Sequence, residues 1–188
     1  MGNDLDKWVK ENVTEDRLRE LNDPDKHPVS HLRWVPAEQV HANDYNPNVV
    51  APPELKLLLL SICEDLFTQP IVAWEVGPDN YEVVDGFHRH KVGKLLGMNR
   101  LPIVTVNQDR VDRGDRIAST IRHNRARGKH QVGAMSEIVQ ELARRNWSNE
   151  KIGRELGMEP DEVLRLKQIT GLAEMFADQE FSEAWEAD

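Results

Sequence analysis

This sequence lacks several features that would assign a chain to a class at once. Cys63 is its only cysteine, so no disulfide can form within the chain, which is typical of proteins of the reducing cytoplasm. Apolar runs such as Leu57–Leu60 are far too short to cross a bilayer, and the acidic N-terminal stretch has none of the basic-then-apolar pattern of a secretory signal. We therefore expect a cytoplasmic protein without a membrane partner.

Aromatic residues are also scarce, at 6%, and basic residues are fewer than acidic ones, 24 against 33. The 39% of hydrophobic residues, over 188 positions, is enough to bury a core and excludes a disordered, collagen-like or disulfide-rich chain. The acidic surplus is uneven, because from Gly86 to Lys129 eleven Lys or Arg stand against three Asp, a local charge of +8 that leaves −17 elsewhere. Such a block indicates binding of an anion, phosphate or nucleic acid; the alternative is a solvated basic face.

Three regions follow from the patterning of the chain. Residues 1–29 are polar and predict a helical leader, residues 30–118 alternate strand and helix patterns, and residues 119–188 contain only helical patterns and end in an acidic tail. We expect an α+β fold, a small mixed sheet with flanking helices followed by an all-helical domain. The predicted strands are 70–76, 81–84 and 101–106, and the predicted helices are 54–62, 88–96, 117–123, 132–145, 149–156 and 161–170.

The segment Asp85-Gly-Phe-His-Arg89 lies where a predicted strand ends and a predicted helix begins. Amides at a helix N-terminus and the helix dipole favour an anion, and Gly86 allows close approach of the backbone. Arg89 adds a forked donor in what we expect to be an open pocket, and His88 adds a donor that titrates near neutrality. Asp85 is suited to binding a metal or to accepting a proton from an attacking hydroxyl. The alternative is a plain strand-to-helix turn that Asp85 caps.

A second basic segment, Arg122–His130, contains six basic or histidine side chains and no acidic one, and Gly128 interrupts its helix pattern. Self-repulsion makes such a cluster unfavourable unless an anion neutralises it. A triphosphate or a DNA backbone would serve, and a solvated helix end is the alternative.

The motif Asp85-Gly-Phe-His-Arg-His-Lys-Val-Gly93, followed by Leu95-Leu-Gly97 and Leu101-Pro-Ile-Val-Thr-Val106, resembles the core of the ParB/sulfiredoxin superfamily. Upstream, Ser61-Ile62 and Thr68-Gln69-Pro70-Ile71 are similar to the segment on the nucleoside side of that family's pocket. The chain looks closest to the short, phage- and island-borne IbrB-like group of ParB relatives, described as transcriptional co-activators.

The resemblance implies a site for ATP or CTP, with Mg²⁺ as a further cofactor. It implies catalytic roles for Asp85, His88 and Glu38, with Asp85 also as the metal ligand. Phe87 stands where sulfiredoxins carry a catalytic cysteine, which excludes sulfinic-acid repair, and His123 stands where ParB proteins carry a glutamate associated with magnesium. The nucleotide-binding residues implied are Thr68, Gln69, Pro70, Gly86, Phe87, His88, Arg89, Arg122, His123, Asn124, Arg127 and Lys129.

Residues 147–170 have the spacing of a helix-turn-helix. Ser148 is suited to cap the first helix, Gly153 to the helix crossing and Gly157 to the turn. Arg165 and Lys167 are the candidate DNA-binding side chains, whereas the acidic pair Asp161-Glu162 at the start of the second helix opposes phosphate. The buried positions expected are Ile152, Leu156, Met158, Val163 and Leu166. A purely structural helical pair is the alternative.

The function expected is a ParB-like nucleotide-binding protein, a slow NTPase, whose nucleotide state biases DNA or partner binding in gene regulation. A protein partner would bind the helical domain or the acidic tail. Two alternatives remain open: a phosphotransferase resembling free serine kinases, and a DNA-binding regulator without nucleotide chemistry.

Overall fold

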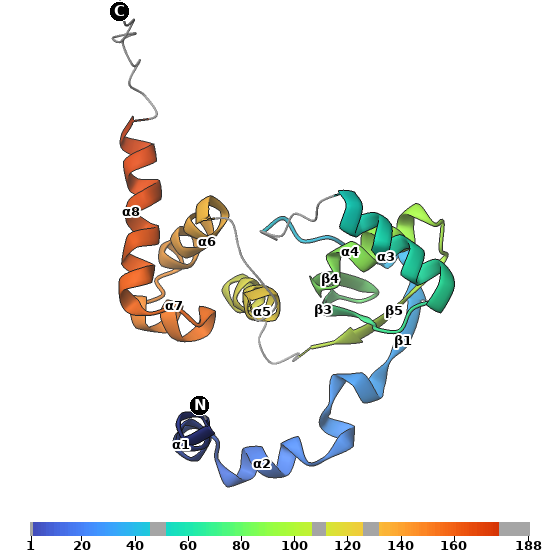
Figure 1. The fold of residues 1–188 in the computed structure, drawn as a ribbon, viewed down its shortest axis with the longest axis horizontal. Helices are drawn as coiled ribbons and strands as arrows, with labels where there is room; N and C mark the ends of the chain where they lie inside the picture. The colour runs from blue at the N-terminus through green and yellow to red at the C-terminus, as the bar shows by residue number, and fades with distance from the viewer. Residues whose placement is uncertain (1, 46–51, 107–111, 126–131, 177–188) are drawn as a thin grey trace, which may run out of the picture. The chain divides into compact units, whose positions relative to one another are not determined.

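The computed structural model describes residues 2–45, 52–106, 112–125 and 132–176 (Figure 1). These residues fall into two compact units. The sheet unit lies within Met1–Ala42 and Pro53–Gln108, and the helical unit within Asn43–Pro52 and Asp109–Asp188. The helix that spans residue 118, the boundary expected from the sequence, packs into the core of the helical unit.

The sheet unit contains a five-stranded mixed sheet with strand order β1-β5-β3-β4-β2. Strands β3 and β4 form an antiparallel hairpin, β5 runs parallel to β3, β1 pairs antiparallel with β5, and β2 pairs parallel with β4. The mixed sheet expected from the sequence is confirmed. The strands are β1 (Arg33–Pro36), β2 (Val40–His41), β3 (Ile71–Gly77), β4 (Asn80–Asp85) and β5 (Arg100–Thr105).

Alternation of side chains along these strands places one face of the sheet in a hydrophobic core. Residues two apart, such as Ile71 and Ala73 on β3 or Tyr81 and Val83 on β4, point to that face. The core is completed by Val35, Ala37, Val40, Leu101 and Ile103, with Phe67, Phe87 and Met98 packed against it.

Two longer helices accompany the sheet, α3 (Pro52–Asp65) and α4 (Phe87–Leu95). Helix α4 approaches β5 closely, because a Cβ on Gly93 would lie 2.5 Å from a methyl group of Leu101. The leader is helical as predicted and contains α1 (Gly2–Asn12), α2 (Glu15–Leu21), η1 (Pro24–Lys26) and η2 (Pro28–His31); a further turn, η3 (Ala37–Gln39), joins β1 to β2.

The helical unit contains α5 (Arg113–Arg125), α6 (Val132–Arg144), α7 (Asn149–Leu156) and α8 (Pro160–Phe176), which confirms the four predicted helices. Its core is apolar and draws on all four of them and on Trp147 between α6 and α7. No helix among the described residues is long and apolar enough to span a membrane.

Candidate functional site

The turn between β4 and α4 forms the centre of the candidate site. Strand β4 ends at Asp85, Gly86 adopts a left-handed conformation with φ of +89°, and α4 begins at Phe87. The first helical hydrogen bond runs from the His90 amide to the Gly86 carbonyl, at 2.8 Å. Glycine suits this position, because residues with a side chain rarely adopt this φ and because a Cβ would lie 2.9 Å from the Arg89 guanidinium, which would then have to shift.

The guanidinium of Arg89 folds back across Gly86 and contacts a second segment of the chain. Its Nη1 donates to Oε1 of Gln69 at 3.1 Å, and its Nη2 donates to the Pro70 carbonyl at 3.2 Å. The same Nη2 lies 3.7 Å from a carboxylate oxygen of Asp85. The Arg89 side chain is 17% exposed, so it does not stand in an open pocket as the sequence suggested.

The structure therefore brings together five of the residues that the resemblance implied. We call Gln69, Pro70, Asp85, Gly86 and Arg89 the Arg89 cluster. It joins the loop implied for the nucleoside to the turn implied for phosphate, although the two are separated by about fifteen residues of hairpin. Thr68 lies exposed in the same loop, beside Gln69.

Glu38, the second proposed carboxylate, lies exposed on η3, in the connection between the two edge strands of the sheet. Within the described residues it makes no polar contact to the Arg89 cluster. Those residues also contain no group of three or more His, Cys, Asp or Glu that could hold a metal ion. Mg²⁺ is commonly held by one or two carboxylates together with substrate phosphates, and Asp85 is the one carboxylate of the Arg89 cluster.

His88 is half-buried on the first turn of α4, with its ring edge-on to Phe87 at a centroid distance of 5.6 Å. Burial lowers the pKa of His88, and the neighbouring cations Lys91 and Arg89 lower it further. At pH 7 the ring is therefore mostly neutral, so it offers one N–H donor and carries no positive charge. Phe87 packs against the sheet core.

His90 is a residue whose role the sequence did not indicate. It is buried, and its Nε2 lies 3.0 Å from the carbonyl oxygen of Val40, which also accepts from Nζ of Lys94 at 3.0 Å. His90 and Lys94 are four residues apart and share one face of α4, so both side chains hold the helix to the first residue of β2. This spacing could have indicated a shared partner but not which one, because Val40 lies fifty residues away.

The second basic segment lies in the helical unit. Nη1 of Arg122 contacts the carboxylate of Glu155 at 2.5 Å, which ties α5 to α7. His123 is half-buried on α5. The structure describes neither Arg127 nor Lys129, and it describes only the backbone of Asn124. The phosphate contacts expected of these three residues stay predictions.

The helix-turn-helix has the local geometry that the sequence predicted. Oγ of Ser148 accepts from the Lys151 amide at 3.2 Å and caps α7, and Gly157 ends that helix with φ of +67°. A Cβ on Gly153 would lie 2.7 Å from the Met158 carbonyl oxygen, so only glycine fits this crossing. The expected positions Ile152, Leu156, Met158, Val163 and Leu166 are all buried.

The two candidate DNA-binding side chains of α8 differ in their surroundings. Arg165 is exposed. Lys167 is half-buried, and its Nζ donates to Oδ1 of Asn149 at the start of α7, at 2.5 Å. Lys167 therefore fastens α8 to α7, whereas Arg165 is available to a ligand on the outer face. The acidic tail after residue 176 lies outside the described residues.

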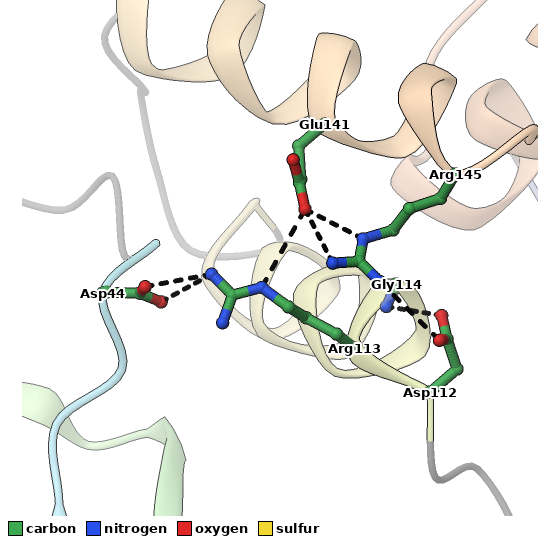
Figure 2. Close-up of polar contacts among 6 residues, drawn as sticks. All are labelled: Asp44, Asp112, Arg113, Gly114, Glu141 and Arg145. Carbon is green, nitrogen blue, oxygen red and sulfur yellow. Dashed lines mark hydrogen bonds and ion pairs between the residues drawn. The ribbon is translucent and has the colours of Figure 1, made fainter.

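An ion-pair network that the sequence did not reveal lies at the start of α5 (Figure 2). Arg113 donates from Nη2 to both carboxylate oxygens of Asp44, at 2.9 and 3.0 Å, and its guanidinium lies over the ring of Tyr45. Its Nε lies 3.9 Å from Glu141, which also pairs with Arg145 at 2.8 Å. These contacts anchor residues 43–45 to the helical unit. They border a cavity of about 390 Å³.

Two segments of this chain match known protein families. The model of the ParB N-terminal domain matches residues 21–118, and that of the IbrB-like C-terminal HTH domain matches residues 130–178. Uncharacterized protein YbdM of Escherichia coli (strain K12) is 48% identical over 198 residues, which cover 97% of this chain and 93% of that protein.

Two solved structures share the fold. The first is a Pnob8-like ParB-N domain, which is 17% identical to this chain. The match covers 79% of this chain and 73% of the chain in that structure, with a TM-score of 0.53. The second is the C-terminally truncated chromosome-partitioning protein ParB of Caulobacter crescentus, complexed to the centromeric parS site. It is 20% identical, the match covers 77% of this chain and 76% of the ParB chain, and the TM-score is 0.51. The resemblance drawn from the Asp85–Arg89 motif is thereby confirmed. The chain belongs to the ParB N-terminal domain family and carries an IbrB-like C-terminal helix-turn-helix domain.

Proposed function

We propose that this protein binds a nucleoside triphosphate, ATP or CTP, at the Arg89 cluster, and that the bound nucleotide biases how its helical unit engages DNA in gene regulation. One observation carries the proposal: a guanidinium is held across a glycine at the start of a helix, in contact with the loop implied for the nucleoside. Slow hydrolysis would follow where water reaches the terminal phosphate.

The chemistry of this turn favours a phosphate ligand. Helix α4 is nine residues long, and its first amides and its dipole attract negative charge. Gly86 has no side chain of its own, and the Arg89 guanidinium that lies over it has a planar fork that matches phosphate oxygens. Asp85 would hold Mg²⁺ together with the phosphates. The segment from Arg122 to Lys129 stays the proposed source of further phosphate contacts on sequence resemblance alone.

The DNA part of the proposal is supported by the helix-turn-helix and by the exposed Arg165 on its second helix. The ParB protein of Caulobacter crescentus, which shares the fold, is the one complexed to a centromeric site. For this chain, a nucleotide-dependent affinity for DNA is the corresponding proposal.

Isothermal titration of the full chain with ATP, CTP, GTP and ADP, each with Mg²⁺, tests nucleotide binding. We expect saturable heat from at least one triphosphate and weaker binding of ADP, because the turn recognises phosphate. Absence of heat from all four at high protein concentration would show that the Arg89 cluster is not a nucleotide site.

A DNA-binding regulator without nucleotide chemistry is the second candidate. It is favoured by the contacts of Arg89, which are those of an internal ion pair and two hydrogen bonds to protein acceptors. On this account Arg165→Ala weakens DNA binding and lowers its salt dependence by about one counterion, with or without nucleotide. If nucleotide changes the DNA affinity of the unmodified chain several-fold, this second candidate is excluded.

A further inference from the structure

The loop before β3 presents Gln69 to Arg89 from a fixed position. Phe67 packs against the sheet core on one side of the loop, and Ile71, which is fully buried, begins β3 on the other. Gln69 therefore stands between two anchored residues, although its own side chain is exposed. Its amide oxygen is placed by the fold and not only by its own rotamer.

The guanidinium of Arg89 meets two neighbouring acceptors from that loop. Nη1 donates to the Gln69 side chain and Nη2 donates to the Pro70 carbonyl, at 3.1 and 3.2 Å. Because the guanidinium is planar, two such bonds fix the plane and rotation of the whole group. A carboxylate oxygen of Asp85, 3.7 Å from Nη2, attracts the charge of the guanidinium.

The chemistry of glutamine matters at this position. A neutral amide oxygen accepts a hydrogen bond from Arg89 and adds no negative charge of its own beside the guanidinium. A glutamate at the same place would orient the guanidinium equally well, yet it would neutralise the charge and repel phosphate. Replacing Gln69 by alanine removes the group that orients Arg89, whereas replacing it by glutamate keeps that group and adds a negative charge. The two substitutions therefore separate the effect of orientation from the effect of charge.

We propose that Gln69 is a positioning residue that sets the orientation of Arg89 for phosphate, so that the loop on the nucleoside side and the phosphate turn act as one unit. The inference rests on the proposed function, since it names how that same site is organised. It makes the affinity for phosphate depend on a side chain of the other loop.

A double-mutant cycle tests the proposal in the full chain. We expect Gln69→Ala to weaken triphosphate binding about five- to tenfold, as loss of one hydrogen bond to a charged group would, and to have little further effect in an Arg89→Ala background. Gln69→Glu should weaken binding at least as much. Gln140→Ala is the matched control, because Gln140 makes the same kind of contact to Arg144, at 3.3 Å, in the helical unit.

A second measurement needs no nucleotide. Nitrogen-15 NMR of the Arg89 guanidinium, assigned by its disappearance in Arg89→Lys, should give separate Nη signals in the unmodified chain and in Gln69→Glu. In Gln69→Ala these signals should average, because the hydrogen bond from Nη1 to the Gln69 side chain is gone.

The outcomes separate the two proposals. If the unmodified chain binds no nucleotide, the proposed function fails, whereas the NMR signals still decide whether Gln69 orients Arg89. If nucleotide binds but Gln69→Ala leaves the affinity unchanged, or if its effect simply adds to that of Arg89→Ala, Gln69 is not a positioning residue. Averaged Nη signals in the unmodified chain would also overturn the inference.

Discussion

At the scale of single residues, Gly86 meets two demands at once, a left-handed backbone and room for the Arg89 guanidinium. Its φ of +89° strains any residue with a side chain, and a Cβ there would press on the Arg89 guanidinium. Gly97 has a similar φ of +69°, but a Cβ there would meet open space. This pair separates backbone strain from displacement of Arg89.

We predict that Gly86→Ala and Gly97→Ala both destabilise the sheet unit, by about 1–3 kcal/mol of backbone strain. Only Gly86→Ala should also weaken nucleotide binding, by roughly tenfold, because it displaces the guanidinium. Thermal unfolding and calorimetric titration of the two variants check this. Equal losses of affinity would contradict the role given to Gly86.

The lowered pKa of His90 predicts a dependence of stability on pH. Burial is the main cause, and the charge of Lys94 acts in the same direction. In the unfolded chain a histidine binds its proton as the pH falls below about 6.5. Folded His90 binds its proton only at a lower pH. Between the two pKa values the unfolded state therefore binds more protons, and the free energy of unfolding decreases as the pH is lowered. His88 shifts in the same direction and contributes likewise.

We expect the melting temperature of the unmodified chain to drop between pH 7.5 and pH 5.5, and to drop less in His90→Gln. Glutamine keeps a donor for the Val40 carbonyl but has no proton to bind. Parallel melting curves for the two proteins across this interval would contradict the assignment.

At the scale of elements, the crossing of α7 and α8 depends on Gly153. We predict that Gly153→Ala destabilises the helical unit by about 1–3 kcal/mol, because the new Cβ would lie 2.7 Å from a backbone oxygen that cannot move without moving α8. Gly133 is a matched control on α6, since a Cβ there meets nothing within 4 Å. Gly133→Ala should be neutral or stabilise by up to about 1 kcal/mol. Thermal unfolding that ranks the two variants the other way would refute the close crossing.

The segment Asn43–Tyr45 is fastened to the helical unit by Asp44 and Arg113 (Figure 2). The hydrogen bond from Arg113 lowers the pKa of Asp44, so this pair stabilises the fold above about pH 4 and its contribution is lost at lower pH. The Asp44 side chain is 71% exposed, so salt screens the pair.

We predict that Asp44→Ala costs about 0.5–1 kcal/mol at pH 7 and low salt, and less in 1 M salt. Asp16→Ala removes a fully surface-exposed pair with Arg19 on α2 and should cost less. Chemical unfolding at the two salt concentrations measures both. A loss in Asp44→Ala that salt does not reduce would show that packing of Tyr45, and not charge, holds the segment.

At the scale of the whole molecule, local sequence patterns predicted most of the elements. These patterns depend on near neighbours in the chain: the alternation of 81–84, the turn residues before it and the helical periodicity after residue 115. The predicted bounds of α7, 149–156, are the observed ones. The division into compact units lies before α5, because α5 packs through Ile117, Ala118 and Ile121 into a core formed by later helices. No local sequence pattern indicates into which of the two cores α5 packs.

The candidate site was predictable as a motif but not as a geometry. Asp85 to Arg89 is one continuous stretch, whereas the two acceptors of Arg89 before β3 are 20 and 19 residues away and the partner of His90 is 50 away. Counting charges also overstated the basic block, since Arg113 and Arg122 are paired with Asp44 and Glu155. Such pairings join distant segments, and only the folded chain shows them.

The central claim is that Arg89 is the charged fork of a nucleotide site, and its replacement tests that claim most directly. Arg89→Ala should weaken triphosphate binding by on the order of ten- to hundredfold, corresponding to about 1.5–3 kcal/mol for a charge-assisted contact. Arg89→Lys should recover only part of this, because an ammonium cannot span two phosphate oxygens. Calorimetric titration at a temperature where all three proteins are folded gives the affinities. Equal triphosphate affinity in Arg89→Ala and the unmodified chain would contradict the account.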